Sequence, residues 1–275
     1  MYSVYLDDSY IKSTQKESIP LINAMGGIII DNEDKLVQII KNEKGKYTHE
    51  NLSIKWNFKD SEIQRVFKEF KRNTDYKKLL ENSRAIRLAI IQKSLELDYK
   101  IIFSCIKSFS EKKKIVKAKK EDFSGILFEN ILYRIGNEAK YNNPGKYQIV
   151  MDWPTDANPQ PYNRAYYYMY NADKTLSGNP NHCGPLCKLN LKQSVFYTKC
   201  THSPCLQFSD LIVGAMKDFL EMSLFGSKES CVGKEAYDLF KNKIRNNSGK
   251  KLGYGIITPN GNTEFKDQLI SIFEK

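Results

Sequence analysis

The sequence predicts an α/β fold in which helices flank a mixed β-sheet. Two apolar runs, residues 2–6 and 147–151, have the β-branched and aromatic composition of strands, and each is followed by a carboxylate. An amphipathic helix over 123–135 separates the second run from an expected strand over 99–106. A helix between two strands is typical of a βαβ unit, which places both strands parallel in one sheet.

The remaining elements follow from periodicity and from turn and cap residues. Further strands are expected over 24–30, 52–56 and 189–197, and near 254–257. Further helices are expected over 61–71, 82–97 and 234–243, from Pro204 onwards with Ser203 as N-cap, and from Thr263. Residues 35–41 fit either a short helix or a strand. We therefore expect antiparallel hairpin strands first and parallel strands later.

Length and composition are those of a folded protein. The chain has 275 residues, of which 41% are hydrophobic and 27% charged, and it can form one domain with an elaboration. No apolar run approaches the ~20 residues needed to cross a bilayer, and no secretory segment is visible, so the sequence predicts a cytoplasmic protein without membrane contact. In that compartment the six cysteines indicate thiols or a metal site before disulfides.

The net charge of +11 and the pI near 9.1 favour a polyanionic partner, above all nucleic acid. A lysine-rich proteome would give every surface the same excess, so the charge alone does not choose between the two explanations. The charged run over 107–121 is most simply a solvated loop and helix start, with contact to phosphates as the alternative.

Carboxylates stand at the ends of both strands that define the fold. Asp7 and Asp8 follow the first strand, and Asp152 follows the second. If these strands lie side by side and run in the same direction, Asp7 and Asp152 converge at one edge of the sheet. A carboxylate at the tip of a buried strand is held on rigid backbone, and such a position suits a metal ligand.

The helix that begins at Pro204 carries a third acid. At helical spacing Gln207, Asp210, Gly214 and Lys217 fall on one stripe, while apolar residues cover the rest of the helix. Asp210 fits a further metal ligand opposite the strand ends, and Gln207 and Lys217 are then candidates for substrate contact. The wet side of an amphipathic helix explains the same stripe without any function.

A tyrosine-rich stretch follows Asp152. Five tyrosines surround Arg164, at positions 162, 166, 167, 168 and 170. Aromatic rings beside a basic group can stack on unpaired bases, which makes Arg164 a candidate substrate-binding residue. A helix whose tyrosines pack on the sheet is the alternative.

Cysteine and histidine cluster between residues 182 and 205. Cys183, Cys187, Cys200 and Cys205 form two pairs whose spacing permits a structural tetrahedral Zn²⁺ site. Free buried thiols are the alternative explanation.

Taken together, these motifs resemble the DUF3800 family of bacterial and phage-associated proteins. The resemblance rests on residues 5–9, the Gly26-Gly27 strand, the strand before Asp152 and, most specifically, the segment 206–215 with the sequence LQFSDLIVGA. It implies an RNase H-like fold over residues 1–222, with 158–205 as a Tyr/Cys/His-rich insertion and 223–275 as a C-terminal helical extension packed on the same domain.

The resemblance also implies a nuclease that depends on Mg²⁺ or Mn²⁺. Asp7, Asp152 and Asp210 match the positions of the family's metal ligands, Asp8 stands where the family often has glutamate, and Lys55 matches a lysine that can face a phosphate. The fourth ligand and the choice of RNA or DNA stay open. Two other functions are kept beside it: a nucleic-acid-binding or assembly module with a degenerate site, and a zinc-stabilised protein partner within a larger defence system.

Overall fold

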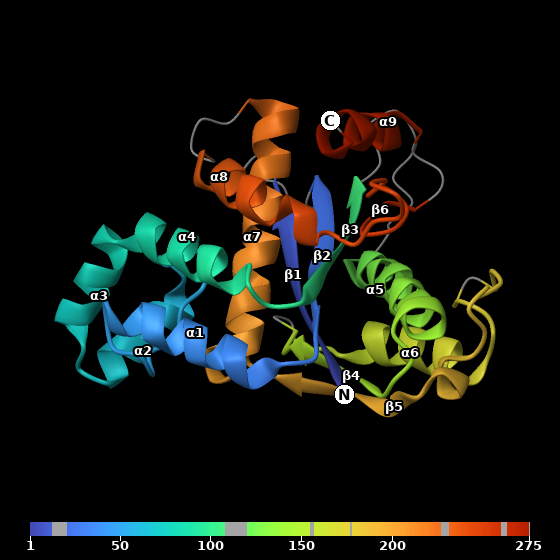
Figure 1. Cartoon of the computed structure of the whole chain (residues 1–275), viewed down its shortest axis with the longest axis horizontal. Coiled ribbons are helices and arrows are strands. Elements are labelled where there is room, and N and C mark those ends of the chain that lie inside the picture. Colours follow the sequence, from blue (N-terminus) through green and yellow to red (C-terminus); the bar gives the residue numbers. More distant parts are fainter. Residues whose placement is uncertain are drawn as a thin grey trace.

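A computed structural model describes residues 1–12, 21–107, 120–154, 157–176, 178–226, 231–259 and 263–274. In these residues one six-stranded sheet forms the centre, with the strand order β5-β4-β1-β2-β3-β6 (Figure 1). The strands are β1 (Tyr2–Ile11), β2 (Ile22–Ile30), β3 (Tyr99–Lys107), β4 (Tyr147–Asp152), β5 (Leu191–Thr198) and β6 (Ile256–Ile257).

The sheet is mixed, as the sequence predicts. β2 pairs antiparallel with both β1 and β3, whereas β4 is parallel to β1, β5 is parallel to β4, and β6 is parallel to β3. The expected βαβ relation also holds, because β3 and β4 run in the same direction. They are not neighbours, since β1 and β2 lie between them.

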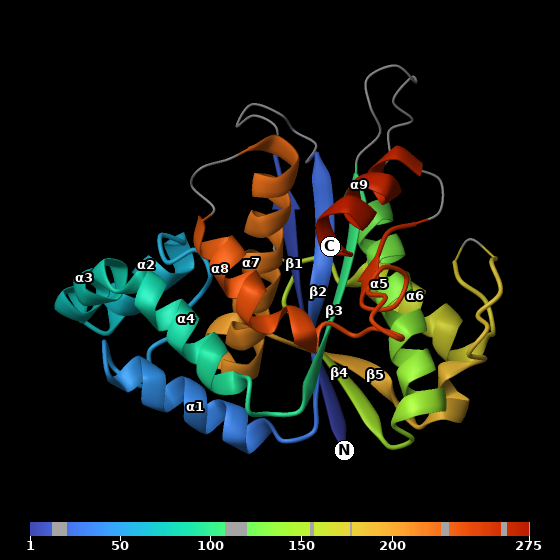
Figure 2. The same ribbon diagram turned by 45° about the horizontal axis from the view of Figure 1, so that its top comes forward.

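Helices cover both faces of the sheet (Figure 2). They are α1 (Glu33–Gly45), α2 (Ser61–Glu69), α3 (Asn73–Glu81), α4 (Ser83–Ser94), α5 (Lys120–Asn137), α6 (Gln160–Asn171), α7 (Pro204–Phe225), α8 (Cys231–Phe240) and α9 (Thr263–Phe273). Apolar side chains of α1, α4, α7, α8 and α9 share one core with Tyr5 of β1. Side chains of α5 and α6 share the other core with Leu6, because neighbouring strand residues point to opposite faces.

Side chains cap the starts of two helices, and the cap of α7 is the one that the sequence predicts. Ser203 precedes α7 and its hydroxyl accepts a hydrogen bond from the Leu206 N–H at 3.3 Å. Asp60 precedes α2 and its carboxylate accepts from the Glu62 N–H at 2.9 Å. The ambiguous residues 35–41 lie within α1, and α3 is a helix that the sequence analysis missed.

The expected strand over 52–56 is wrong. This segment has no strand partner, and two of its N–H groups bond to side chains of α7 instead. The Ile54 N–H donates to Gln207 Oε1 at 3.4 Å, and the Trp56 N–H donates to Asp210 Oδ2. Alternating apolar residues therefore mark a buried extended segment that is bound to a helix. Of the charged run over 107–121, residues 108–119 lie outside the described part of the chain.

The paired glycines of β2 permit close strand contact, as their position in an apolar run suggests. A Cβ atom at Gly27 would lie 1.8 Å from the Tyr5 carbonyl oxygen, and one at Gly26 would lie 2.7 Å from the Ile102 carbonyl oxygen. Only glycine fits between β1 and β3 at these positions.

The C-terminal residues contribute to the same fold. β6 joins the edge of the sheet beside β3, and α8 packs against α7. The buried Glu138 lies on a single π-helical turn (Glu138–Asn142) and accepts hydrogen bonds from Lys100 at 2.5 Å and from Arg245 at 2.7 Å. Residues 223–275 are therefore more than a helical extension, because they supply an edge strand. None of the helices within the described ranges has the length and apolarity that a membrane crossing requires.

Candidate carboxylate site

The register of two parallel strands places Asp7 and Asp152 side by side. Leu6 pairs with Met151, and each aspartate is the next residue on its strand. Tyr5 and Val150, two residues earlier, pack in the core on the α7 side. Because side chains alternate along a strand, both carboxylates also face α7. The convergence expected from the sequence is therefore present.

Helix α7 adds Asp210 to this pair. The neighbouring Ser209 hydroxyl donates a 2.9 Å hydrogen bond to the Tyr5 carbonyl oxygen, which fixes this turn of α7 against β1. Asp210 then lies close enough to Asp7 for their carboxyl groups to share a hydrogen bond. Figure 1 shows α7 running along β1.

Burial and mutual repulsion make the three carboxyl groups weak acids. Burial raises the pKa of Asp7 well above its usual range, and the charges of Asp210 and Asp152 raise it further. Burial also raises the pKa values of Asp152 and Asp210. The hydrogen bond between Asp7 and Asp210 is the expected result, because one proton relieves the repulsion between two buried carboxylates.

Main-chain N–H groups orient each carboxylate. Asp7 Oδ1 accepts from the Asp8 N–H at 2.9 Å. Asp152 Oδ1 accepts from the N–H groups of Trp153 at 2.9 Å and Cys200 at 2.6 Å. Asp210 Oδ2 accepts from the Trp56 N–H. Each of these hydrogen bonds uses one oxygen of its carboxylate, and the backbone that donates it is held in a strand, a helical turn or a packed segment.

Trp56 is held along α7 by contacts at three successive turns of the helix. Its N–H bonds to Asp210, its ring covers Gly214, where a Cβ would lie 2.2 Å from Trp56 Cγ, and its indole N–H donates to Asp218 at 2.7 Å. From the other side the Arg87 guanidinium lies 4.6 Å from the ring centroid and donates to the Trp56 carbonyl oxygen. The spacing of Asp210, Gly214 and Asp218 along one helix stripe is the sequence signal for this contact.

Lys55 lies close enough to the carboxylates to interact with them electrostatically. Burial lowers the pKa of its ammonium, but Cys200, Asp152 and Asp210 outweigh burial and the net shift is upward. Lys55 Nζ lies 3.2 Å from Glu62 Oε2, and Lys199 Nζ lies 3.6 Å from Glu62 Oε1.

Glu62 is the acid that sequence reasoning missed. Its charge contributes to the raised pKa of Asp152, after burial, so Glu62 belongs to the same electrostatic neighbourhood. A glutamate in the first turn of a helix is common for reasons of helix stability alone, and no motif distinguished this one.

Gln207 has a different role from the substrate contact we expected. The side chain is buried, and Oε1 accepts from Lys44 Nζ at 3.4 Å and from the Ile54 N–H. Its Nε2 donates to the carbonyl oxygens of Cys200 at 3.2 Å and Thr201 at 3.4 Å. Gln207 therefore joins α7 to the segments on both sides of the site and positions them.

The structure does not group three further candidates with the acids. Asp8 follows Asp7 on β1, so its side chain points to the opposite face of the sheet. Lys217 lies two turns beyond Asp210 and pairs with Asp218 at 2.9 Å. Arg164 is exposed on α6, which packs on the face opposite α7.

Two of the tyrosines around Arg164 pack in the core, as expected if this helix packs on the sheet and does not stack on bases. Tyr162 and Tyr166 are buried in the core beneath α6, whereas Tyr167 and Tyr168 are exposed.

The four cysteines expected to bind zinc do not come together. Cys183 is buried in the core on the α5 side and lies 2.8 Å from Asn181 Oδ1, and Cys187 is exposed. Cys200 and Cys205 are buried in the other core. The sheet separates the two pairs despite their closeness in sequence. Cys200 borders the carboxylate site, and burial, followed by the charges of Asp210 and Asp7, raises the pKa of its thiol.

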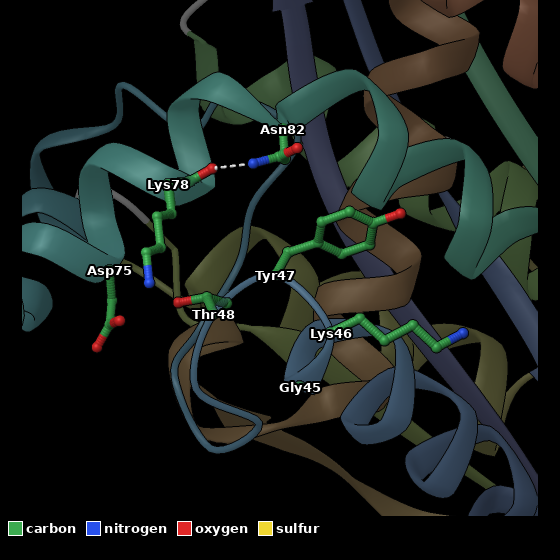
Figure 3. Close-up of a pocket in the computed structure, with 7 residues that line it drawn as sticks. All are labelled: Gly45, Lys46, Tyr47, Thr48, Asp75, Lys78 and Asn82. Atoms are coloured by element: carbon green, nitrogen blue, oxygen red, sulfur yellow. Dashed lines mark hydrogen bonds between the residues drawn. The ribbon is translucent and has the colours of Figure 1, made fainter.

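A separate hollow of about 450 Å³ lies between the end of α1 and helix α3 (Figure 3). Its lining is Gly45, Lys46, Tyr47, Thr48, Asp75, Lys78 and Asn82. None of the candidate site residues lines it. The lining mixes acidic and basic side chains, and Lys46 is already paired with Glu43 at 2.6 Å.

In the described ranges, no three His, Cys, Asp or Glu side chains are already arranged as ligands around one point. Comparison with known proteins found no matching family model, no matching curated protein and no matching solved structure.

Proposed function

We propose that this protein is a divalent-metal-dependent nuclease that hydrolyses phosphodiester bonds of RNA or DNA. One observation carries the proposal: three carboxylates from β1, β4 and α7 meet on one face of the sheet, and a main-chain N–H orients each of them. Elements far apart in the sequence have to be folded together to produce this group. A cluster of buried acids is unfavourable for stability, so its presence favours a functional role.

We also propose that the fold is RNase H-like. The strand order β3-β2-β1-β4-β5 supports it, because three antiparallel strands are followed by two strands parallel to β1. The positions of the acids support it as well: one lies on the central strand β1, one at the end of the adjacent β4, and one on the helix that follows β5. The resemblance of the sequence to the DUF3800 family led to the same expectation.

The donor set fits Mg²⁺ or Mn²⁺. Three carboxylates offer the oxygen ligands that hard cations prefer. The hydrogen bond between Asp7 and Asp210 requires a proton on one of them, and a divalent cation would neutralise the same negative charge more completely. When bound, such ions make an attacking water more acidic and stabilise the charge on the leaving oxygen. Asp7, Asp152 and Asp210 would hold them.

The surrounding residues have roles that the contacts suggest. Lys55 stays protonated, because its net pKa shift is upward, and its ammonium is available to a phosphate if it leaves Glu62. Trp56 and Gln207 keep Asp210 and the 52–56 segment in place. The net charge of +11 attracts a polyanionic substrate to a site whose own charge is negative. A setting in phage defence or in mobile elements remains a prediction from the family resemblance.

The test is a cleavage assay with the full-length protein. Labelled single-stranded and double-stranded RNA and DNA are incubated with the protein and Mn²⁺, Mg²⁺ or EDTA. We expect Mn²⁺-dependent cleavage that Asp7→Asn and Asp152→Asn each reduce at least 1000-fold while nucleic-acid binding is retained. Asp238→Asn, a surface carboxylate paired with Lys234 at 2.6 Å, is the control and keeps full activity. If the protein binds nucleic acid but cleaves none of these substrates, it is a binding or assembly module instead.

A further inference from the structure

Two exposed aromatic rings lie at the end of the sheet that carries Asp152. Trp153 follows Asp152 directly and is 45% exposed, and Phe196 on the edge strand β5 is 50% exposed. Neither ring is needed for the core, since each leaves about half of its surface in water. Large exposed rings beside a group of buried acids require an explanation, because aromatic side chains gain most from being covered.

Phe196 lies on the same face of the sheet as the carboxylates. It pairs with Val150, whose side chain packs toward α7, and two residues later Thr198 pairs with Asp152. Paired residues point to the same face, so Phe196 is displaced from Asp152 across the sheet by one strand spacing, about 4.8 Å, and along the strand by two residues, about 6.6 Å. This separation is close to one nucleotide of an extended strand. A base stacked on Phe196 therefore leaves the adjoining phosphate near Asp152.

Trp153 lies at the end of β4 with its ring on the α6 face of the sheet, opposite to the face of Phe196 and Asp152, because successive strand residues alternate and the ring contacts Tyr197 of the α6-side core. Its N–H donates to the Thr198 carbonyl oxygen at 3.0 Å, and its ring meets Tyr197 edge-on with the centroids 6.0 Å apart. The Tyr197 hydroxyl donates to Asn163 Oδ1 on α6 at 2.8 Å, which fixes the supporting ring. A ring held in this way offers a face for stacking at little cost in conformational entropy.

The charges around these rings favour nucleic acid over a protein partner. Lys192, Gln193 and Ser194 are exposed on the same edge strand, and Lys199 follows it with 49% of its side chain exposed. An edge strand with polar and lysine side chains resists pairing with another strand, and it does not offer the continuous apolar patch of a protein interface. Lysines beside isolated aromatic rings are typical of surfaces that bind single strands.

We propose that this end of β4 and β5 binds an unpaired nucleic-acid strand that passes over the end of β4, with one base stacked on Phe196 on the carboxylate face and another on Trp153 on the α6 face. This inference rests on the proposed nuclease function and adds the class of substrate, which is single-stranded nucleic acid. Bases within a duplex are covered on both faces by their neighbours, whereas an unpaired base can lie on a protein ring. Binding by stacking tolerates any base, so we expect little sequence preference.

Binding measured without cleavage tests the proposal. Fluorescence anisotropy in EDTA compares a labelled 20-nucleotide DNA, the RNA of the same sequence and the corresponding duplexes on full-length protein. We expect both single strands to bind at least 10-fold more tightly than the duplexes. Phe196→Ala and Trp153→Ala should each weaken single-strand binding by about 5- to 100-fold, and Phe196→Tyr should retain it. Tyr141→Ala, which removes another exposed ring, is the matched control and leaves binding unchanged.

A spectroscopic readout separates stacking from a general loss of structure. Trp153 is exposed and Trp56 is buried, and the chain has only these two tryptophans. A bound single strand should therefore quench part of the tryptophan fluorescence, and Trp153→Phe should remove that quenching while preserving much of the affinity.

Equal affinity for duplex and single strand, or Phe196→Ala binding like the unchanged protein, would overturn the proposal. A Phe196→Ala variant that changes only from dimer to monomer in sedimentation would assign the surface to a second copy of the chain. Phe196-dependent binding without any metal-dependent cleavage would reject the nuclease function but leave this surface standing. If the cleavage rate is unchanged when either ring is removed, the proposed binding surface is rejected and the nuclease function stands.

Discussion

The backbone N–H of Trp56 donates a hydrogen bond to the Asp210 carboxylate across 154 residues of sequence. Through this contact the 52–56 segment, which has no strand partner, becomes part of the carboxylate site. The same residue rests on Gly214 and bonds to Asp218, so one tryptophan couples the position of Asp210 to the packing of α7. Changes that displace Trp56 should therefore affect the site without touching its acids.

Gly214→Ala is the smallest change that displaces Trp56. The new methyl group would lie 2.2 Å from Trp56 Cγ, so the ring and its backbone have to move away from Asp210. We expect a loss of about 1 to 3 kcal/mol in the free energy of unfolding and at least a 10-fold loss of cleavage. Urea denaturation and the Mn²⁺ cleavage assay measure the two effects.

Gly125→Ala in α5 is the matched control. There the nearest atom to a new Cβ is the Pro161 carbonyl oxygen at 3.6 Å, an ordinary contact, and alanine favours a helix by up to about 1 kcal/mol over glycine. We expect this variant to keep its activity and its stability. Equal behaviour of the two variants would show that the Trp56 contact is unimportant.

Asp7→Asn should stabilise the protein in EDTA at neutral pH. Burial and the nearby acids raise the pKa of Asp7 in the folded state, so the folded chain holds a proton that the unfolded chain releases above about pH 4. Stability is then lost as the pH rises from that value, by at most about 1.4 kcal/mol per pH unit for one group. Asparagine cannot ionise, so the variant does not lose stability in this way as the pH rises.

The signature is a difference that depends on pH. In EDTA at pH 7, the Asp7→Asn variant should unfold at a higher temperature than the unchanged protein, and near pH 4 this difference in unfolding temperature should be smaller. Addition of Mn²⁺ should stabilise the unchanged protein more than the variant, because cations compensate the charge that asparagine lacks. A variant that is less stable than the unchanged protein at every pH would show that this acid cluster is not under electrostatic strain.

Lys55→Met should move the acidic limb of the cleavage profile to higher pH. Burial raises the pKa of Asp152, and the charge of Lys55 lowers it; the same charge lowers the pKa of Asp210. Without that charge both acids hold their protons to higher pH, and metal binding requires their ionised forms. Cleavage rates from pH 5 to 9 measure the shift, with Lys234→Met as the surface control. A profile that only falls in height, without moving, would assign Lys55 to substrate contact alone.

Lys44→Met should change how stability depends on alkaline pH. Burial lowers the pKa of Lys44 to about 8, and its ammonium donates to the Leu52 carbonyl oxygen at 2.8 Å and to Gln207. Because the unfolded chain holds this proton to about pH 10.4, the folded state gains stability as the pH rises from 8 toward 10. Denaturation series should show that the variant lacks this increment. Parallel curves for the two proteins would contradict the lowered pKa.

Local patterns were enough to predict the main frame of the site. The apolar runs that end at Asp7 and Asp152, and the capped helix that carries Asp210, are visible in short stretches of sequence. The parallel pairing of these two strands was only a condition in the sequence argument, and the structure supplies it. Asp7 and Asp152 face α7 because successive side chains along a strand point to opposite faces of the sheet.

Long-range contacts account for what the sequence could not predict. Alternation over 52–56 is typical of a strand, and only α7 shows that its N–H groups have another partner. Gln207 shares a helix stripe with Asp210, yet Lys44 and Ile54 bury it. Cys183 and Cys200 are near in sequence, and the sheet between them is a property of the whole fold.

The most direct test of the central claim is a crystal structure of the full-length protein with Mn²⁺, using anomalous scattering to locate the ions. We predict manganese bound by carboxylate oxygens of Asp7, Asp152 and Asp210 together. Manganese absent from these residues at millimolar concentration, or Asp210 turned away from the other two acids with the ion elsewhere, would contradict the account.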